Sequence, residues 1–446
     1  MPHSRFFCAW DRDWKFPRNV SVCRDVSKSS MVPATPPVPQ PKPSRLRIRR
    51  TVGALALGLL AAGSLGWTLK SEAFQLWYLE RQSTAELEQT VRDQPRAPWP
   101  AYVLGTRYAA SGRLEPAMDL FETSRNLEPN NYRPHFSMGL GFLRLGAATA
   151  AVPELQRAAE LAPKDDRVLT YLGVAFRQVD RYRDAVIAGQ TAVKLNPRSA
   201  ENFYQLGLTY YRPTGQQGKG RECFQRAVEL DPTNAAYHRD LASSFSDMGE
   251  YEIAGQHARE AVRLNPSDAV ARYLLGKVLH RSQANVPETV QALREAIRLS
   301  PNTFQPHYEL GLVLEESGEY AEAHKEFEIS SRINAQHQQS WFHQSSTAAR
   351  LGRTAQATAA RQRFQALTKD RDERQFLERR VFDHPTDIAL RLRFAKILER
   401  NDDLVGAAAQ CQAILKQNPK HAETRSFLQY LAKRAGVNES GEPASR

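Results

Sequence analysis

One pattern of apolar and small residues recurs along most of the chain, and most copies of it close on the phrase Leu-x-Pro. The prolines of this phrase are separated by 34, 34, 35, 34 and 35 residues and lie at Pro129, Pro163, Pro197, Pro232, Pro266 and Pro301. Farther along, Pro385 and Pro419 are again 34 residues apart. So regular a period predicts an array of one repeated unit rather than a set of separate globular domains.

The interior of each copy predicts two helices that pack against each other. In the first copy, Gly105 and Ala117 are small enough for two helices to approach closely, and Tyr108 and Phe121 are large enough to fill the space between copies. Gly112 is placed to adopt a positive backbone angle and so end the first helix. The closing proline ends the second helix, because it lacks an amide hydrogen and disfavours helix in the preceding residue.

Later copies repeat this interior, with Gly139, Phe142, Gly146, Ala151 and Leu155 in the second and Gly311, Gly318, Tyr320, Ala323 and Phe327 in the seventh. The pattern resembles the tetratricopeptide repeat (TPR), over roughly residues 97–420, about three quarters of the chain. The resemblance implies an all-α, superhelical solenoid with a concave groove, in which each unit buries its apolar face against its neighbours.

Departures from the pattern set the expected domain boundaries. Asp180 stands where other units have the turn glycine, and Gln344 and Ser345 replace the Leu-Gly pair of the eighth unit. Sixteen extra residues, DRDERQFLERRVFDHP, then follow before the repeat resumes. We expect a helical connector at 70–96, eight TPR units over 97–369, an insertion at 370–387, a degenerate ninth unit at 388–419, a capping helix at 420–435 and a disordered tail at 436–446.

Residues 51–69, TVGALALGLLAAGSLGWTL, carry no charge and are long enough to span most of a bilayer core as a helix. Arg45, Arg47, Arg49 and Arg50 precede them, which favours a cytoplasmic N-terminus and an exported array, with the bacterial periplasm as the expected compartment. The sequence thus predicts a single transmembrane anchor. The alternatives are a signal peptide cleaved after Gly66, which would leave a soluble periplasmic protein, and a buried core helix.

Residues 1–50 are expected to form a disordered, basic tail, because 33–43 read PATPPVPQPKP and the remainder has no helix or strand period. Met31 starts a conventional export sequence and is an alternative initiation site to Met1. This tail holds 11 Lys or Arg against 3 Asp or Glu, so of the net charge of +12 it supplies +8 and the other 396 residues only +4. No nucleic-acid partner is therefore expected, and the basic stretch 350–400 is interpreted as a solvated face, with anionic lipid or nucleic acid as the alternative.

The sequence carries no recognisable catalytic array. It has no glycine-rich phosphate loop, no GxSxG and no HExxH, and its four cysteines, Cys8, Cys23, Cys223 and Cys411, have no ligand spacing. We therefore expect no enzyme activity, no cofactor and no metal site. His135, His238 and His307 share the fourth position of their units, too far apart to share a metal, and are expected to be ordinary half-buried histidines.

The resemblance implies which residues line the concave groove, namely positions two, five, nine, twelve and thirteen of each unit. Six of the nine fifth positions are aromatic, and arginines recur at the twelfth and thirteenth. The candidate peptide-binding groove comprises Tyr102, Phe136, Arg144, Arg177, Tyr204, Tyr211, Arg212, Tyr273, Arg281, Tyr308, Phe342 and Arg350. Aromatic faces with interleaved arginine suit an extended peptide or an amphipathic helix. The alternative is that these rings only pack inside the array.

Together these patterns predict a membrane-anchored scaffold that binds other proteins or peptides on the exported side. Its partners would be the lipid bilayer, through residues 51–69, and a protein or peptide in the groove. The alternatives are the soluble exported protein and an assembly factor that resembles the membrane-tethered TPR subunits of cytochrome c maturation.

Overall fold

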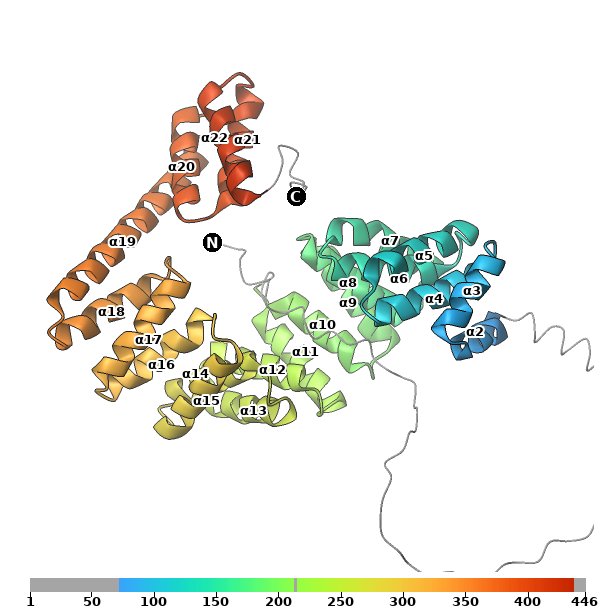
Figure 1. The fold of residues 1–446 in the computed structure, drawn as a ribbon, viewed down its shortest axis with the longest axis horizontal. Helices are drawn as coiled ribbons and strands as arrows, with labels where there is room; N and C mark the ends of the chain where they lie inside the picture. The colour runs from blue at the N-terminus through green and yellow to red at the C-terminus, as the bar shows by residue number, and fades with distance from the viewer. Residues whose placement is uncertain (1–71, 212–214, 437–446) are drawn as a thin grey trace, which may run out of the picture. The chain divides into compact units, whose positions relative to one another are not determined.

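The computed structural model describes residues 72–211 and 215–436, and all the regular structure in these two ranges is helical (Figure 1). The predicted N-terminal tail, the predicted membrane helix at 51–69, the first two residues of the connector and all but Gly436 of the predicted C-terminal tail lie outside the described residues. Among the helices that are described, none combines the length and the apolar character needed to cross a bilayer.

The chain forms two compact units, the first ending at Leu230 and the second beginning at Asp231. The helices of the first unit are α2 (Glu72–Arg81), α3 (Thr84–Asp93), α4 (Pro98–Ala110), α5 (Leu114–Leu127), α6 (Tyr132–Arg144), α7 (Ala148–Leu161), α8 (Asp166–Gln178), α9 (Tyr182–Leu195), α10 (Ala200–Tyr211) and α11 (Gln217–Leu230). The two connector helices lead, and α3 begins with a capping box in which Ser83 and Glu86 bond each other's backbone amides. The other helices pack as consecutive pairs, starting with α4 and α5.

The second unit continues the pairwise arrangement. Its helices are α12 (Ala235–Asp247), α13 (Tyr251–Leu264), α14 (Ala269–Arg281), α15 (Val286–Leu299), α16 (Phe304–Glu316), α17 (Tyr320–Ile333), α18 (Gln338–Arg350), α19 (Thr354–Asp383), α20 (Ile388–Arg400), α21 (Leu404–Gln417) and α22 (Ala422–Ala435). Many first helices of a pair start at an Asn or Asp whose side chain accepts backbone amides, as Asn234 and Asp268 do. The asparagine or aspartate two residues after the recurring proline is therefore a helix start signal.

Close approach of paired helices depends on the small residues that the sequence pattern singles out. A Cβ atom built on Gly105 would lie 2.7 Å from Cε1 of Phe121, and one on Gly311 would lie 2.6 Å from Cε1 of Phe327. Phe121 and Phe327 are almost completely buried, so their rings occupy the space that a side chain at the glycine would need. The prediction that these glycines allow the two helices to approach is confirmed.

The turn between paired helices has the predicted positive backbone angle. Gly112 and Gly318 have φ of 83° and 82°. Asp180, which replaces the glycine in the third unit, adopts φ of 61°, so the turn is kept at some conformational cost to a residue with a side chain. The first helix of the pair therefore ends at a residue with positive φ even where that residue is not glycine.

The largest departure from paired helices is α19, which has 30 residues and is about 45 Å long at 1.5 Å per residue. The residues expected as an insertion, 370–387, continue this helix as far as Asp383 instead of forming a separate segment. The first part of α19 packs on α18, and its last part buries Leu377 and Val381 against residues of α20, α21 and α22. One helix thus packs on α18 and also joins the C-terminal hydrophobic core, and Figure 1 shows it as the long orange helix between α18 and α20.

Candidate functional site

In the first compact unit, the fifth-position rings of Tyr102 and Tyr204 pack against the second helix of their own pair, and that of Phe136 packs against the next pair. The ring centroid of Tyr102 lies 6.0 Å from that of Phe121, and the Tyr204 centroid lies 5.9 Å from that of Phe224. Tyr204 is only 8% exposed, and burial raises the pKa of Tyr102. Phe136 is equally buried and lies 5.8 Å from Tyr171. These contacts give the rings a packing role, and a binding role for them stays a prediction.

In the second compact unit, the fifth-position rings become more exposed toward α18. Tyr273 and Tyr308 are half-buried, and burial is the main cause of the raised pKa of Tyr308. Tyr308 lies 5.9 Å from Phe327, in the same arrangement as in the first unit. Phe342 on α18 is 47% exposed. Of the aromatic residues predicted to line the groove, Phe342 presents the most open ring.

The predicted arginines of the groove make local contacts. Arg144 donates to the carbonyl of Ala109 at 3.1 Å, and Arg177 donates to the side-chain oxygen of Gln205 at 3.2 Å. Arg350 donates to the hydroxyl of Tyr320 at 2.9 Å. Arg281 is exposed, and Arg212 lies outside the described residues. The remaining predicted groove residue, Tyr211, is buried against Phe224.

A row of rings leads from α16 across α18 to α19. Tyr308 lies 4.7 Å from His337 and 5.8 Å from His343, measured between ring centroids. Phe342 lies 5.1 Å from His343 and 5.5 Å from Phe364 of α19. Nδ1 of His343 is 2.7 Å from a carboxylate oxygen of Glu315, and burial lowers the pKa of His337. The row therefore connects the predicted groove to the surface of the long helix.

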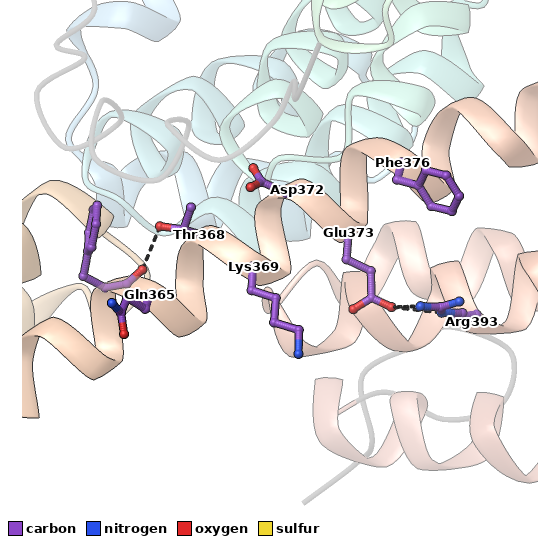
Figure 2. Close-up of a pocket in the computed structure, with 8 residues that line it drawn as sticks. Gln365, Thr368, Lys369, Asp372, Glu373, Phe376 and Arg393 are labelled. Atoms are coloured by element: carbon purple, nitrogen blue, oxygen red, sulfur yellow. Dashed lines mark hydrogen bonds and ion pairs between the residues drawn. The ribbon is translucent and has the colours of Figure 1, made fainter.

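An open pocket of about 640 Å³ begins where this row ends. Its lining residues come from α19 and α20 and are Phe364, Gln365, Thr368, Lys369, Asp372, Glu373, Phe376 and Arg393. We call this set the α19 pocket. Figure 2 shows Glu373 of α19 and Arg393 of α20 pointing toward each other, and their closest N–O distance is 2.6 Å. Phe376 is 55% exposed, so one wall of the pocket presents an aromatic ring to solvent.

Polar groups of both signs surround the apolar part of the α19 pocket. Asp372 is paired with Arg371 at 3.1 Å, whereas Lys369 makes no ion pair with any residue in the described ranges. Thr368 accepts a hydrogen bond from Gln338 of α18 and donates to the carbonyl of Phe364 at 2.9 Å. The arrangement suits contact with an apolar side chain that is flanked by a charged group. Nothing in it pairs a nucleophile with a base.

Elsewhere in the second compact unit, buried and half-buried charged side chains on the first helices of the pairs form ion pairs or hydrogen bonds with groups of opposite charge. Arg239 lies 2.9 Å from Asp268 and 3.0 Å from Asp240. Nδ1 of His280 is 2.7 Å from Glu309, which is only 3% exposed, and this hydrogen bond raises the pKa of His280. Within the described residues, no cluster of three or more His, Cys, Asp or Glu side chains could hold a metal ion.

Comparison with known proteins assigns the repeat. A tetratricopeptide repeat family model matches residues 136–200 and 239–304, and a second tetratricopeptide repeat model matches residues 200–234. The chain contains tetratricopeptide repeats. A search among curated proteins found no match. The helix pairs within these matched residues are therefore tetratricopeptide repeat units.

Three similar solved structures each cover less than half of this chain. PilF of Pseudomonas aeruginosa is 19% identical, with 48% of this chain and 96% of that chain covered and a TM-score of 0.43. MamA of Desulfovibrio magneticus RS-1 is 26% identical, with 38% and 94% covered and a TM-score of 0.34. YrrB, described as a TPR protein with an unusual peptide-binding site, is 16% identical, with 45% and 100% covered and a TM-score of 0.36.

Most of the α19 pocket lies outside the positions that the TPR resemblance assigns to the groove. Phe364 and Lys369 lie on the second helix of their unit, and Phe376 lies in the extra residues. One signal in the sequence could have indicated this surface. No Gly or Pro occurs between Gly352 and Pro385, so nothing ends the helix where the repeat pattern requires an end.

Proposed function

We propose that this protein is a TPR scaffold that binds a protein or peptide partner at the α19 pocket and the adjoining ring of Phe342. The main support for this proposal is the difference in exposure among the aromatic rings at the fifth repeat position. Phe342 stays half-exposed beside an open pocket, whereas the other fifth-position aromatics rest on a buried neighbour. Binding energy at protein interfaces is concentrated in aromatic residues that become buried on association, and an exposed ring next to a pocket meets that requirement.

The lining of the pocket defines the partner in chemical terms. Phe364 and Phe376 would take an apolar side chain, aromatic or leucine, from the partner. Lys369, which has no ion pair in the part of the chain that the structure describes, would pair with a carboxylate beside that side chain. We infer a peptide segment in which an apolar anchor adjoins an acidic residue.

We further propose that the scaffold is held at a membrane by residues 51–69 and that its TPR array is exported. Support comes from the uncharged run of 19 residues and from the arginines immediately before it. A reporter that is active only outside the cytoplasm, fused after Arg446, should be active, and the product should stay in membranes after alkaline carbonate. Release by carbonate would favour signal cleavage instead, and a silent reporter would contradict the orientation.

The binding proposal is tested in the full chain with a photo-crosslinking residue at position 376. This position should label a discrete partner in native membranes, and the label should decrease about five- to tenfold when Phe342 is also replaced by Ala, as expected for loss of about 1 kcal/mol or more. The matched control is a crosslinker at position 430, where Tyr430 is 49% exposed but lies away from the pocket. Equal labelling with and without Phe342→Ala would contradict the proposed site.

A further inference from the structure

The fourth position of the TPR unit has a structural role that the sequence did not reveal. In three units its histidine Nε2 lies within hydrogen-bond distance of the carbonyl six residues earlier, at the closing proline of the preceding unit. These contacts are His135 to Pro129 at 3.2 Å, His238 to Pro232 at 3.1 Å and His307 to Pro301 at 3.2 Å. All three histidines are buried. Each contact satisfies a carbonyl near a helix end.

Other units fix the direction of this hydrogen bond. Arg272, Trp341 and Arg391 occupy the same position and donate to the carbonyls of Pro266, Ala335 and Pro385. Arginine and tryptophan side chains carry donors only, and a carbonyl only accepts. The histidines therefore use Nε2–H as the donor, and only their Nδ1 remains available for a second partner.

In two of the three units that second partner is a carboxylate. Nδ1 of His135 lies 2.6 Å from Glu154, and Nδ1 of His307 lies 2.6 Å from Glu326. A carboxylate accepts from a ring that is protonated on both nitrogens. The α6–α7 and α16–α17 pairs therefore accommodate a charged fourth-position histidine.

The α12–α13 pair has a histidine where the others have glutamate. Nδ1 of His238 lies 3.1 Å from Nδ1 of His257, which is on α13 and whose ring is parallel to that of Phe245 at 5.8 Å. Because Nε2–H of His238 is committed to Pro232, neutral His238 presents a lone pair at Nδ1, and His257 supplies the single proton between the rings. When both rings are charged, two N–H groups face each other at this distance.

Few charged groups act on this histidine pair. Glu260, one turn along α13 from His257, favours the protonated form of His257, but it is already bonded through two oxygens to Arg263. Burial, and to a lesser extent His238, lowers the pKa of His257, and the smaller opposing effect is that of Glu260. At a pH below the ordinary histidine pKa of about 6.5, His257 then binds more protons in the unfolded chain than in the folded one, so stability falls as the pH falls.

We propose that the histidine pair His238–His257 makes the α12–α13 helix pair, the first of the second compact unit, an acid-sensitive element of the array. Protonation of both rings opposes the contact between α12 and α13. Since a repeat unit depends on its own helix contact and its immediate neighbours, the effect is local opening of this pair rather than unfolding of the whole array. This inference does not depend on the proposed peptide site.

Hydrogen exchange of the full chain tests the inference, with protection factors compared at about pH 7.5 and about pH 5.5, either side of the ordinary histidine pKa. Because pH 5.5 lies only about one unit below the ordinary histidine pKa, a lowered pKa of His257 should reduce the protection of α12–α13 by up to about tenfold at the lower pH. The α6–α7 and α16–α17 pairs, which have His–Glu contacts, should lose much less.

Reciprocal substitutions separate the histidine pair from general acid effects. His257→Glu should abolish the selective loss in α12–α13, and Glu326→His should transfer it to α16–α17. His257→Gln is a second variant, because its amide can accept from or donate to His238 and so tolerates both protonation states. Equal loss of protection in all three helix pairs, or unchanged acid loss in α12–α13 after His257→Glu, would overturn the inference.

Discussion

Two neighbouring helix pairs, α16–α17 and α18–α19, both have an aromatic residue at the fifth repeat position, but the two rings differ in exposure. Tyr308 of α16 lies on Phe327, nineteen residues later, and is half-buried. Phe342 of α18 has Arg361 nineteen residues later, and this arginine is exposed. Phe342 therefore contacts Phe364 of α19 instead and stays 47% exposed. Exposure of the fifth-position ring is thus decided by the residue on the second helix of the unit.

The largest expected loss of stability follows from removing Phe327, the buried ring on which Tyr308 packs. Phe327→Ala should destabilise the α16–α17 pair by about 3–5 kcal/mol, because it removes a fully buried ring and leaves a cavity. Phe342→Ala should cost less than about 1 kcal/mol, since half of that ring is already solvated. Hydrogen exchange in each helix pair measures both effects. Similar losses for the two variants would contradict the assignment of one ring to the core and the other to a surface.

A smaller effect is expected at the glycine that lets Phe327 pack. Gly311→Ala should destabilise α16–α17 by about 1–3 kcal/mol, because its Cβ would lie 2.6 Å from the Phe327 ring. Ser345 occupies the equivalent position in α18, where a Cβ atom is already present, and it donates to the carbonyl of Ala357 at 3.0 Å. Ser345→Ala is the matched control and should cost no more than this single hydrogen bond. Exchange rates that are unchanged by Gly311→Ala would show that the Phe327 ring can move aside.

Arg361→Phe should convert the open unit into the packed one. A ring at position 361 would offer Phe342 the support that Phe327 gives Tyr308, and we expect about 1 kcal/mol of added stability in α18–α19. Partner crosslinking from position 376 should decrease at the same time, because Phe342 would be covered. Arg361→Leu, which has no aromatic ring, is the control. Added stability with undiminished crosslinking would separate Phe342 from the binding site.

The smallest effect concerns His280, whose pKa is raised chiefly by its hydrogen bond to Glu309. A raised pKa in the folded state contributes stability that is complete below the ordinary value of about 6.5 and is lost as the pH rises through the folded pKa. This dependence is opposite in sign to that of His257. Glu309→Gln should lower the pKa of His280, as measured by NMR titration of its ring. A pKa of His280 at or below the ordinary value in the unmodified chain would refute this assignment.

Much of the fold could be predicted because it depends on local rules. Glycines such as Gly112 and Gly318 mark the turns between paired helices, and a glycine opposite a phenylalanine indicates close packing of two helices. The candidate site was harder, because a groove position in the repeat pattern indicates where a side chain begins and not what covers it. Tyr204 and Phe342 have equivalent positions in the pattern, but one is 8% exposed and the other 47%.

The sequence by itself determined the period, the helix pairs, the turns and the uncharged segment at 51–69, since each depends on the spacing of residues close together in the chain. Tertiary structure decided that residues 370–383 extend α19, because Leu377 and Val381 bury themselves among side chains of three later helices. It also decided that His238 faces another histidine while His135 and His307 face glutamates. Such pairings join residues of separate helices, and their consequences for binding and protonation follow from burial and distance.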